Sequence, residues 1–184
     1  MTAAQADLRT QFREMPDGLR IDRPTVADGG ALWRIARDSR TLDLNSSYSY
    51  LLWCRDFAGT SVVARDADGQ PVGFITGYIR PTRPGTLVVW QVAVDTAHRG
   101  RGLAAALLDG LTGRVTADRA SAPVALNALE TTITPGNTAS ERLFLSYAER
   151  HGLAVDREVL FGAGVFPDGG HDPEILYRIG PFAG

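Results

Sequence analysis

The chain has 184 residues, 44% of them hydrophobic and 22% charged, which fits one soluble globular domain. Its formal net charge of −2 provides no bulk field toward nucleic acid or an acidic membrane, so neither is expected as a partner. All 19 basic residues are arginine, which excludes lysine Schiff-base chemistry and a Walker A phosphate loop. Cys54 is the single cysteine, so no internal disulfide can form, and no apolar run has the length of a signal peptide or membrane span. A cytoplasmic location is therefore expected.

Residues 1–17 are polar and predict a flexible N-terminal tail, and residues 18–184 are predicted to form a single domain. Hydrophobic patterning predicts strands at residues 19–24, 60–65, 72–79, 86–95, 124–131, 156–161 and 174–179. Helices are predicted from residue 26 and at residues 48–57, 101–117 and 134–150, the last with Pro135 in its first turn. Strands dominate early and helix–strand alternation follows, so the fold class is α/β with a mixed sheet.

The most informative segment lies between a buried strand and an apolar helix, at Arg99-Gly-Arg-Gly-Leu-Ala104. Gly100 and Gly102 lack a Cβ atom, so an anion can approach the main chain there. The unpaired N–H groups and the dipole of the following helix favour a phosphate at this point. The alternative is an ordinary tight turn with two solvated arginines.

The segment matches the pattern Arg/Gln-x-x-Gly-x-Gly/Ala and resembles the GCN5-related N-acetyltransferase family. The resemblance implies a mostly antiparallel mixed sheet flanked by helices, with the motif around the pyrophosphate of acetyl-CoA. It also implies that the preceding strand pairs with the pantetheine arm. The cofactor contacts it predicts are Val92, Ala93, Val94, Arg99, Gly100, Arg101, Gly102, Leu103 and Ala104.

A second match follows at Asn137-Thr-Ala-Ser-Glu-Arg-Leu-Phe144. It resembles the later helix of the same family and implies that Asn137 contacts the pantetheine arm. The family usually has a tyrosine where this chain has Phe144, and that tyrosine is credited with protonating the leaving thiolate. Tyr147, one turn further on, is either a substitute or a packed residue. A thiol pKa of about 8–9 also lets the thiolate leave without a dedicated acid.

Acetyl transfer to an amine needs a base, because a free alkylamine has a pKa near 10. Carboxylates are also expected to bind the ammonium groups of an aminated substrate. Asp43, Glu130 and Glu174 are the candidates, and Glu130 or Glu174 is predicted to be the catalytic base. Glu130 ends a predicted strand, so a surface charge there is the alternative.

Two loop regions are distinctive, Asp43-Leu-Asn-Ser-Ser-Tyr48 and Phe166-Pro-Asp-Gly-Gly-His171-Asp-Pro-Glu174. With the strand segment Trp90-Gln-Val-Ala-Val94 and with Thr60-Ser61, they resemble the L-2,4-diaminobutyrate acetyltransferases that serve synthesis of the osmoprotectant ectoine. The resemblance covers about residues 19–180 and implies acetylation of the 4-amino group of a small diamino acid by a homodimer. The substrate contacts it predicts are Asp43, Tyr48, Trp90, His171 and Glu174.

Two other hypotheses stay open on the sequence alone. The enzyme could acetylate another amine, such as a protein N-terminus or a polyamine, or the chain could bind acyl-CoA without catalysis. Cys54 sits among apolar neighbours, which favours a buried thiol over a nucleophile. His98, His151 and His171 form no evident triad, and no Cys/His cluster has metal-ligand spacing, so no metal is expected.

Overall fold

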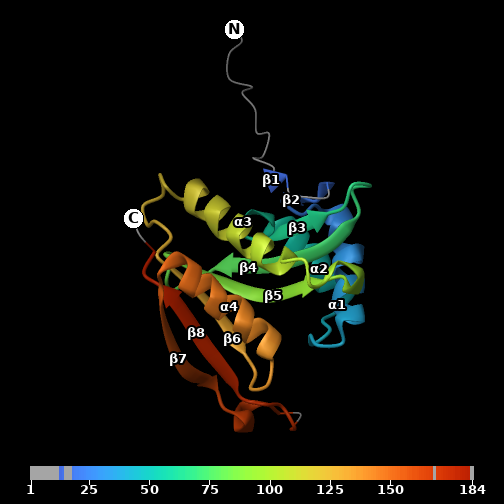
Figure 1. Ribbon diagram of the computed structural model, residues 1–184. Helices are drawn as coiled ribbons and strands as arrows, with labels where there is room; N and C mark the ends of the chain where they lie inside the picture. The colour runs from blue at the N-terminus through green and yellow to red at the C-terminus, as the bar shows by residue number, and fades with distance from the viewer. Residues whose placement is uncertain (1–12, 15–17, 168, 183–184) are drawn as a thin grey trace.

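The computed structural model describes residues 13–14, 18–167 and 169–182 (Figure 1). Its eight-stranded sheet has the order β1-β2-β3-β4-β5-β6-β8-β7. The strands are β1 (Arg13–Glu14), β2 (Arg20–Asp22), β3 (Val62–Arg65), β4 (Pro71–Ile79), β5 (Thr86–Val94), β6 (Ala128–Ile133), β7 (Ala154–Phe161) and β8 (Glu174–Gly180). Every neighbouring pair is antiparallel except β5 and β6, which are parallel. The predicted mixed, mostly antiparallel sheet is thereby confirmed.

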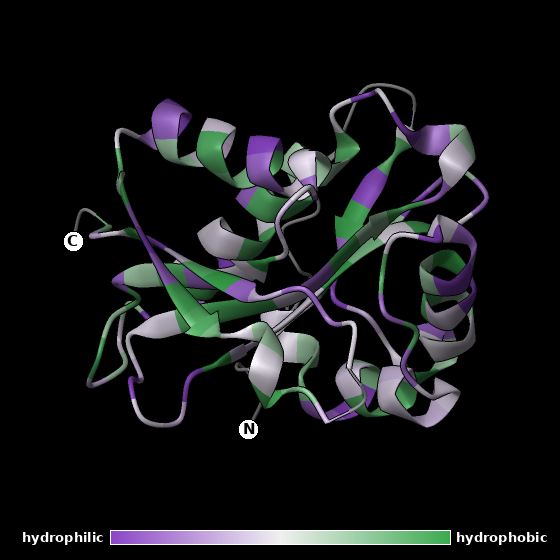
Figure 2. Ribbon diagram, turned by 90° about the horizontal axis from the view of Figure 1, so that it is seen from below, coloured by the Kyte–Doolittle hydropathy of each residue, from purple (hydrophilic) through white to green (hydrophobic). Residues whose placement is uncertain are grey.

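In the described part of the chain, four α-helices cover the sheet: α1 (Gly29–Ser39), α2 (Ser47–Asp56), α3 (Leu103–Asp118) and α4 (Thr138–His151). The larger apolar core lies on the α3 and α4 side and contains Leu107, Leu111 and Phe144. A smaller core lies on the α1 and α2 side and contains Leu32, Tyr50 and Phe74. Figure 2 shows the central strands largely in the hydrophobic colour, as expected for a sheet buried on both faces.

Several predicted boundaries differ from the structure by two or more residues, and three of them bear on the site. The strand expected at residues 124–131 begins at Ala128, because residues 124–127 form a loop in which the exposed Val124 carbonyl accepts a hydrogen bond from Arg119. The helix expected from residue 134 begins at Thr138, since residues 134–137 form a turn and Asn137 caps the helix. The helix expected from residue 101 begins at Leu103, after Gly102 in a left-handed conformation. These corrections move Glu130 into the middle of β6.

Of the predicted tail at residues 1–17, only Arg13–Glu14 fall within the described residues. Their backbones pair with β2 as β1. The remainder of that prediction lies outside the described residues. Among the described helices, none is long and apolar enough to span a membrane.

A β-bulge on β5 marks the place where the sheet opens. The register between β4 and β5 shifts between Thr76 and Gly77, which leaves Trp90 as the extra residue. Gly77 is required there, since a Cβ atom would lie 2.7 Å from the Val88 carbonyl oxygen and 2.9 Å from that of Thr60. The parallel pairing with β6 ends at Val89, opposite Thr131. From Trp90 onward, β5 has no strand on its β6 side within the described part of the chain.

Candidate active site

The turn before α3 has the geometry that the glycine motif predicts. Gly100 and Gly102 have φ values of +74° and +73°, a conformation that favours glycine. Apart from the flanking residues, no described atom lies within 4 Å of the position a Cβ would take at either residue, so the space in front of the turn is open. α3 begins immediately afterwards at Leu103 and points its unpaired N–H groups at this space. The turn therefore has the backbone conformation and the open space that binding of an anion requires.

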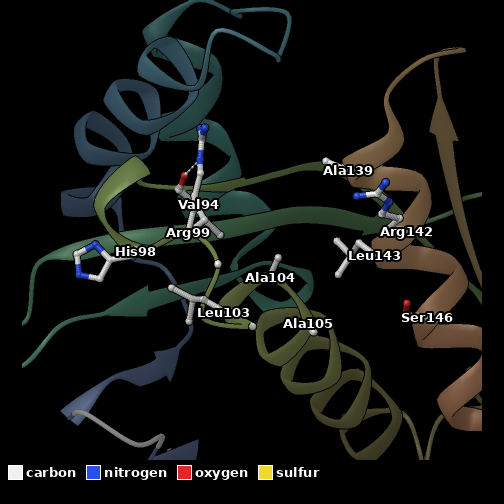
Figure 3. Close-up of a pocket in the computed structure, with 12 residues that line it drawn as sticks. Val94, His98, Arg99, Leu103, Ala104, Ala105, Ala139, Arg142, Leu143 and Ser146 are labelled. Carbon is white, nitrogen blue, oxygen red and sulfur yellow. Dashed lines mark hydrogen bonds between the residues drawn. The ribbon is translucent and has the colours of Figure 1, made fainter.

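A pocket of about 490 Å³ connects this turn to α4 (Figure 3). Its lining residues are Val94, His98, Arg99, Gly100, Gly102, Leu103, Ala104, Ala105, Ala139, Arg142, Leu143 and Ser146. Arg99 is held in place by a hydrogen bond of 3.1 Å from its Nε to the Val94 carbonyl (Figure 3). The pocket thus brings together six of the predicted cofactor contacts: Val94, Arg99, Gly100, Gly102, Leu103 and Ala104.

The other predicted cofactor residues do not line this pocket. Val92 and Ala93 lie on the stretch of β5 beyond the bulge, where the backbone N–H and C=O groups on the β6 side have no strand partner among the residues that the structure describes. Such an open edge can pair with an extended ligand. Arg101 lies in the turn itself, and its side chain is exposed. Asn137 caps α4 by accepting a hydrogen bond of 3.2 Å from the Ser140 N–H, so its carboxamide oxygen already has a structural role.

Sequence reasoning missed the contribution of α4 to the pocket. Ala139, Arg142, Leu143 and Ser146 follow the helical i, i+3, i+4, i+7 spacing and so share one face. That spacing was readable in the sequence once Asn137 was placed at the start of the helix. Arg142 adds a second arginine to the pocket opposite Arg99 (Figure 3), which suits a ligand with several phosphates.

Phe144 and Tyr147 point away from this pocket, into the larger core, and are 2% and 3% exposed. Burial raises the pKa of the Tyr147 hydroxyl, although its hydrogen bond with Thr112 acts in the opposite direction. This location fits a tyrosine that packs in the core better than one that protonates the leaving thiolate. Cys54 is also buried, and burial raises the pKa of its thiol to about 12, as an inert core cysteine requires.

The two distinctive loops meet at the open side of the sheet. The Asp43 carboxylate lies 3.6 Å from Nε2 of His171, although the residues are separated by most of the chain. The His171 ring stacks on Phe166 at a centroid distance of 3.9 Å and an interplanar angle of 11°. The Asp43 side chain is 90% exposed, so its charge faces open space rather than the core.

Gln91 fixes the first loop to β5 and was not singled out from the sequence. Its Nε2 donates to the Asp43 carbonyl at 2.9 Å, and its Oε1 accepts from the Tyr50 hydroxyl at 3.0 Å. Tyr50 is almost fully buried on α2, so this chain of hydrogen bonds anchors the loop to the smaller core. Because Gln91 follows Trp90, the loop backbone is held beside the bulge.

An aromatic group lines the same region. Trp90 is 53% exposed and lies 5.8 Å, between ring centroids, from Trp53 on α2. Trp53 also contacts Phe57 and Tyr78 at 4.7 and 6.3 Å. Trp53 is therefore part of a wall that continues to Trp90, rather than only a core residue. Tyr48 lies in the first turn of α2 and is 64% exposed.

The two predicted bases have different surroundings. Glu130 is 1% exposed, and its two oxygens accept hydrogen bonds from Arg80, at 2.5 Å, and from Arg178. Glu174 is half-buried at the start of β8, three residues after His171. Glu130 is thus enclosed by cations, whereas Glu174 begins the strand that follows the loop carrying His171. No group of three or more His, Cys, Asp or Glu side chains in the described ranges is arranged to hold a metal ion.

Residues 30–148 match the model of the Acetyltransferase (GNAT) family. The chain belongs to this family. It is 72% identical over 183 residues to the L-2,4-diaminobutyric acid acetyltransferase of Streptomyces avermitilis, covering 100% of this chain and 99% of that protein. It is 44% identical to the protein of the same name from Marinococcus halophilus, over 90% of this chain and 92% of that one.

Solved structures agree with this assignment. The diaminobutyrate acetyltransferase EctA from Paenibacillus lautus, solved in complex with its substrate L-2,4-diaminobutyric acid and coenzyme A, superposes with a TM-score of 0.81 at 42% identity. That match covers 90% of this chain and 96% of the other. Ard1 from Thermoplasma volcanium superposes with a TM-score of 0.66 at 20% identity, over 88% of this chain and 97% of that one, which shows the shared fold. The acetyltransferase fold is therefore shown by both sequence and structure.

Proposed function

We propose that this acetyltransferase transfers the acetyl group of acetyl-CoA to the 4-amino group of L-2,4-diaminobutyrate. The observation that carries the proposal is the meeting of Asp43 and His171, with the Asp43 backbone held by Gln91 at the point where β5 leaves β6. The substrate is that of the full-length Streptomyces relative and of the Paenibacillus enzyme. We propose that the product serves ectoine synthesis in the cytoplasm, and that the enzyme works as a homodimer.

The pocket fits acetyl-CoA on its own chemistry. Two glycines with positive φ and a helix N-terminus face open space, and Arg99 and Arg142 add positive charge on two sides. When bound, acetyl-CoA supplies the acetyl group as an activated thioester. We assign the diphosphate to the turn at residues 99–104 and the pantetheine arm to the open edge of β5 at Val92. Backbone N–H groups of that edge are placed to stabilise negative charge on a carbonyl oxygen.

The opposite side of the opening is suited to a diamine. The Asp43 carboxylate attracts an ammonium group, and its backbone is fixed by Gln91, so little ordering is needed on binding. Trp90 and Trp53 form an apolar wall that excludes water from the reacting centre. Tyr48 and His171 lie at the entrance to this side of the opening, and we expect them to form hydrogen bonds with the polar groups of the substrate.

We propose Glu174 as the general base, directly or through one water. Both oxygens of Glu130 already accept hydrogen bonds from arginine, so this carboxylate has little capacity left to take a proton from an amine. Glu174 has no such partners among the described residues and lies at the mouth formed by the second loop. Its role predicts that Glu174→Gln lowers kcat at saturating substrate and removes the acidic limb of the pH–rate profile.

The first test is CoA release from acetyl-CoA with L-2,4-diaminobutyrate, L-ornithine, L-lysine and spermidine as acceptors. We expect diaminobutyrate to have the highest kcat/KM. Asp43→Asn is expected to lower that value by about 10- to 100-fold, the loss of one charge-assisted hydrogen bond, without changing the KM for acetyl-CoA. Asp68→Asn, which removes an exposed carboxylate in the β3–β4 turn, is the matched control. Preference for spermidine, or acetyl-CoA binding without turnover on any amine, would contradict the proposal.

A further inference from the structure

Glu130 organises a small cluster of arginines at the base of the opening in the sheet. The Glu130 side chain is 1% exposed, while those of Arg80 and Arg178 are each 33% exposed. Arg80 comes from the loop after β4 and Arg178 from β8, and each gives one Nη1 group to Glu130. Arg83 lies further away, with its Nη1 at 3.9 Å from Glu130 and its side chain 61% exposed. The carboxylate thus holds two guanidinium groups at a fixed separation.

The cluster carries more positive charge than Glu130 neutralises. Arginine stays protonated in proteins and has five N–H donors in a rigid fork. Beyond the single bond to Glu130, the side chains of Arg80 and Arg178 form no other hydrogen bond within the described residues. Asp156 lies opposite Arg178 on β7, but its exposed carboxylate forms no ion pair with it. Two partly exposed guanidinium forks are therefore left with unused donors.

The location of this cluster relates it to the proposed substrate site. Glu130 pairs with Val88 on β5, and Trp90 lies two residues further along that strand, about 7 Å away at the rise of an extended chain. Glu130 also pairs with Arg178, and Glu174 lies on the same face of β8, four residues before it. The arginines consequently occupy the closed end of the opening, and Glu174 lies toward its mouth.

We propose that Arg80 and Arg178 bind the carboxylate of the amino acid substrate, and that Glu130 is the positioning residue that holds them. This inference rests on the proposed function and explains why the enzyme would select a diamino acid over a diamine that has no carboxylate. A carboxylate fits the paired forks by charge-assisted hydrogen bonds, and the surplus positive charge repels an ammonium group from the same place. The substrate is thereby oriented with its carboxylate inward and its amino groups toward Asp43 and Glu174. A diamine without a carboxylate lacks this anchor.

The test compares L-2,4-diaminobutyrate with 1,3-diaminopropane, the same diamine without its carboxylate, at saturating acetyl-CoA. Arg80→Gln and Arg178→Gln are each expected to lower kcat/KM for diaminobutyrate by about 10- to 100-fold, the cost of a lost charged hydrogen bond. With diaminopropane the change is expected to stay within about threefold, since that substrate makes no such bond. Arg157→Gln is the matched control, because Arg157 lies on the neighbouring strand but faces Tyr177 and Glu141 on the opposite side.

Glu130→Gln separates positioning from proton transfer. A positioning role predicts a raised KM for diaminobutyrate, with the kcat for diaminopropane and its pH profile unchanged. A lowered kcat with both substrates and a shifted acidic limb would make Glu130 the base and overturn the assignment. Arg178→Lys keeps the positive charge but lacks the guanidinium fork, so its preference for diaminobutyrate over diaminopropane is expected to lie between those of the wild type and Arg178→Gln. This variant tests the inference if Arg178→Gln does not fold.

Equal losses with both substrates, or no loss with diaminobutyrate, would overturn the inference while leaving the proposed function intact. Failure of the wild-type enzyme to acetylate diaminobutyrate would overturn both. Wild-type activity on diaminobutyrate therefore tests the substrate, and the losses of the arginine variants on the two substrates test the carboxylate site.

Discussion

The turn before α3 offers a sharp test of the cofactor site, through the substitution Gly102→Ala. Gly102 has φ +73° and ψ 9°, and no atom lies within 4 Å of the position of a new Cβ. The cost to folding is therefore conformational, about 1–2 kcal/mol for an L residue in the left-handed region. Alanine also restricts the unfolded chain, which returns about 0.4–1 kcal/mol. The expected net loss is about 1 kcal/mol, or a fall in Tm of about 2–4 °C.

The functional effect of Gly102→Ala should exceed its effect on stability. The new methyl group would occupy the open space in front of the α3 N-terminus, where the diphosphate is assigned. We expect the KM for acetyl-CoA to rise about tenfold or more, equivalent to one lost charge-assisted hydrogen bond. Initial rates against acetyl-CoA concentration and thermal unfolding by circular dichroism measure the two effects.

Gly113→Ala is the control for this measurement. Gly113 lies in the interior of the same helix, is exposed and has open space around a new Cβ, but its backbone is helical. We expect this variant to be more stable by about 1 kcal/mol, with an unchanged KM for acetyl-CoA. An unchanged KM in Gly102→Ala, or the same rise in both variants, would refute the assignment of the phosphate site.

Three further predictions test other parts of the molecule. Burial raises the pKa of Asp28, but hydrogen bonds from Arg65 and the adjoining turn lower it more, so the pKa lies below its ordinary value. The ionised carboxylate therefore stabilises the fold above about pH 4, and this contribution is lost as the pH falls through the lowered pKa. Asp28→Asn should lower the free energy of unfolding by about 3 kcal/mol at pH 7, and urea unfolding of this variant should show a smaller loss of stability toward acid pH. Tyr147→Phe should leave kcat unchanged and lower stability by about 1 kcal/mol; a large loss of kcat in stopped-flow assays would instead make this tyrosine a proton donor. Gln91→Leu should release the loop at Asp43 and raise the KM for diaminobutyrate at least about fivefold, with the KM for acetyl-CoA unchanged; parallel changes in both constants would contradict this role.

The local features of the site could be predicted from the sequence because each has a short-range cause. A glycine-rich turn between a buried strand and an apolar helix exposes N–H groups wherever it occurs, and Gly100 and Gly102 have the positive φ values that this requires. The resemblance of the two substrate loops led to the expectation that they act together, and Asp43 and His171 are in fact brought within 3.6 Å.

The unpredicted features depend on pairings between distant segments. Glu130 reads as a strand-end charge, but its partners Arg80 and Arg178 are 50 and 48 residues away and come from a loop and a strand on either side of it. The start of β6 was placed too early because Val124 and its neighbours form an apolar run, whereas the structure uses them as a loop. The contribution of Arg142 was hidden because the start of α4 was placed four residues early.

Acetylation of the 4-amino group of L-2,4-diaminobutyrate is tested most directly by the NMR spectrum of the product formed from acetyl-CoA and this amino acid. We expect a downfield shift of the C4 methylene protons and an amide correlation from the acetyl carbonyl to the N4 proton, with the C2 proton still next to a free ammonium group. An acetyl group on N2, or no acetylated product while the protein binds acetyl-CoA, would contradict the proposed reaction.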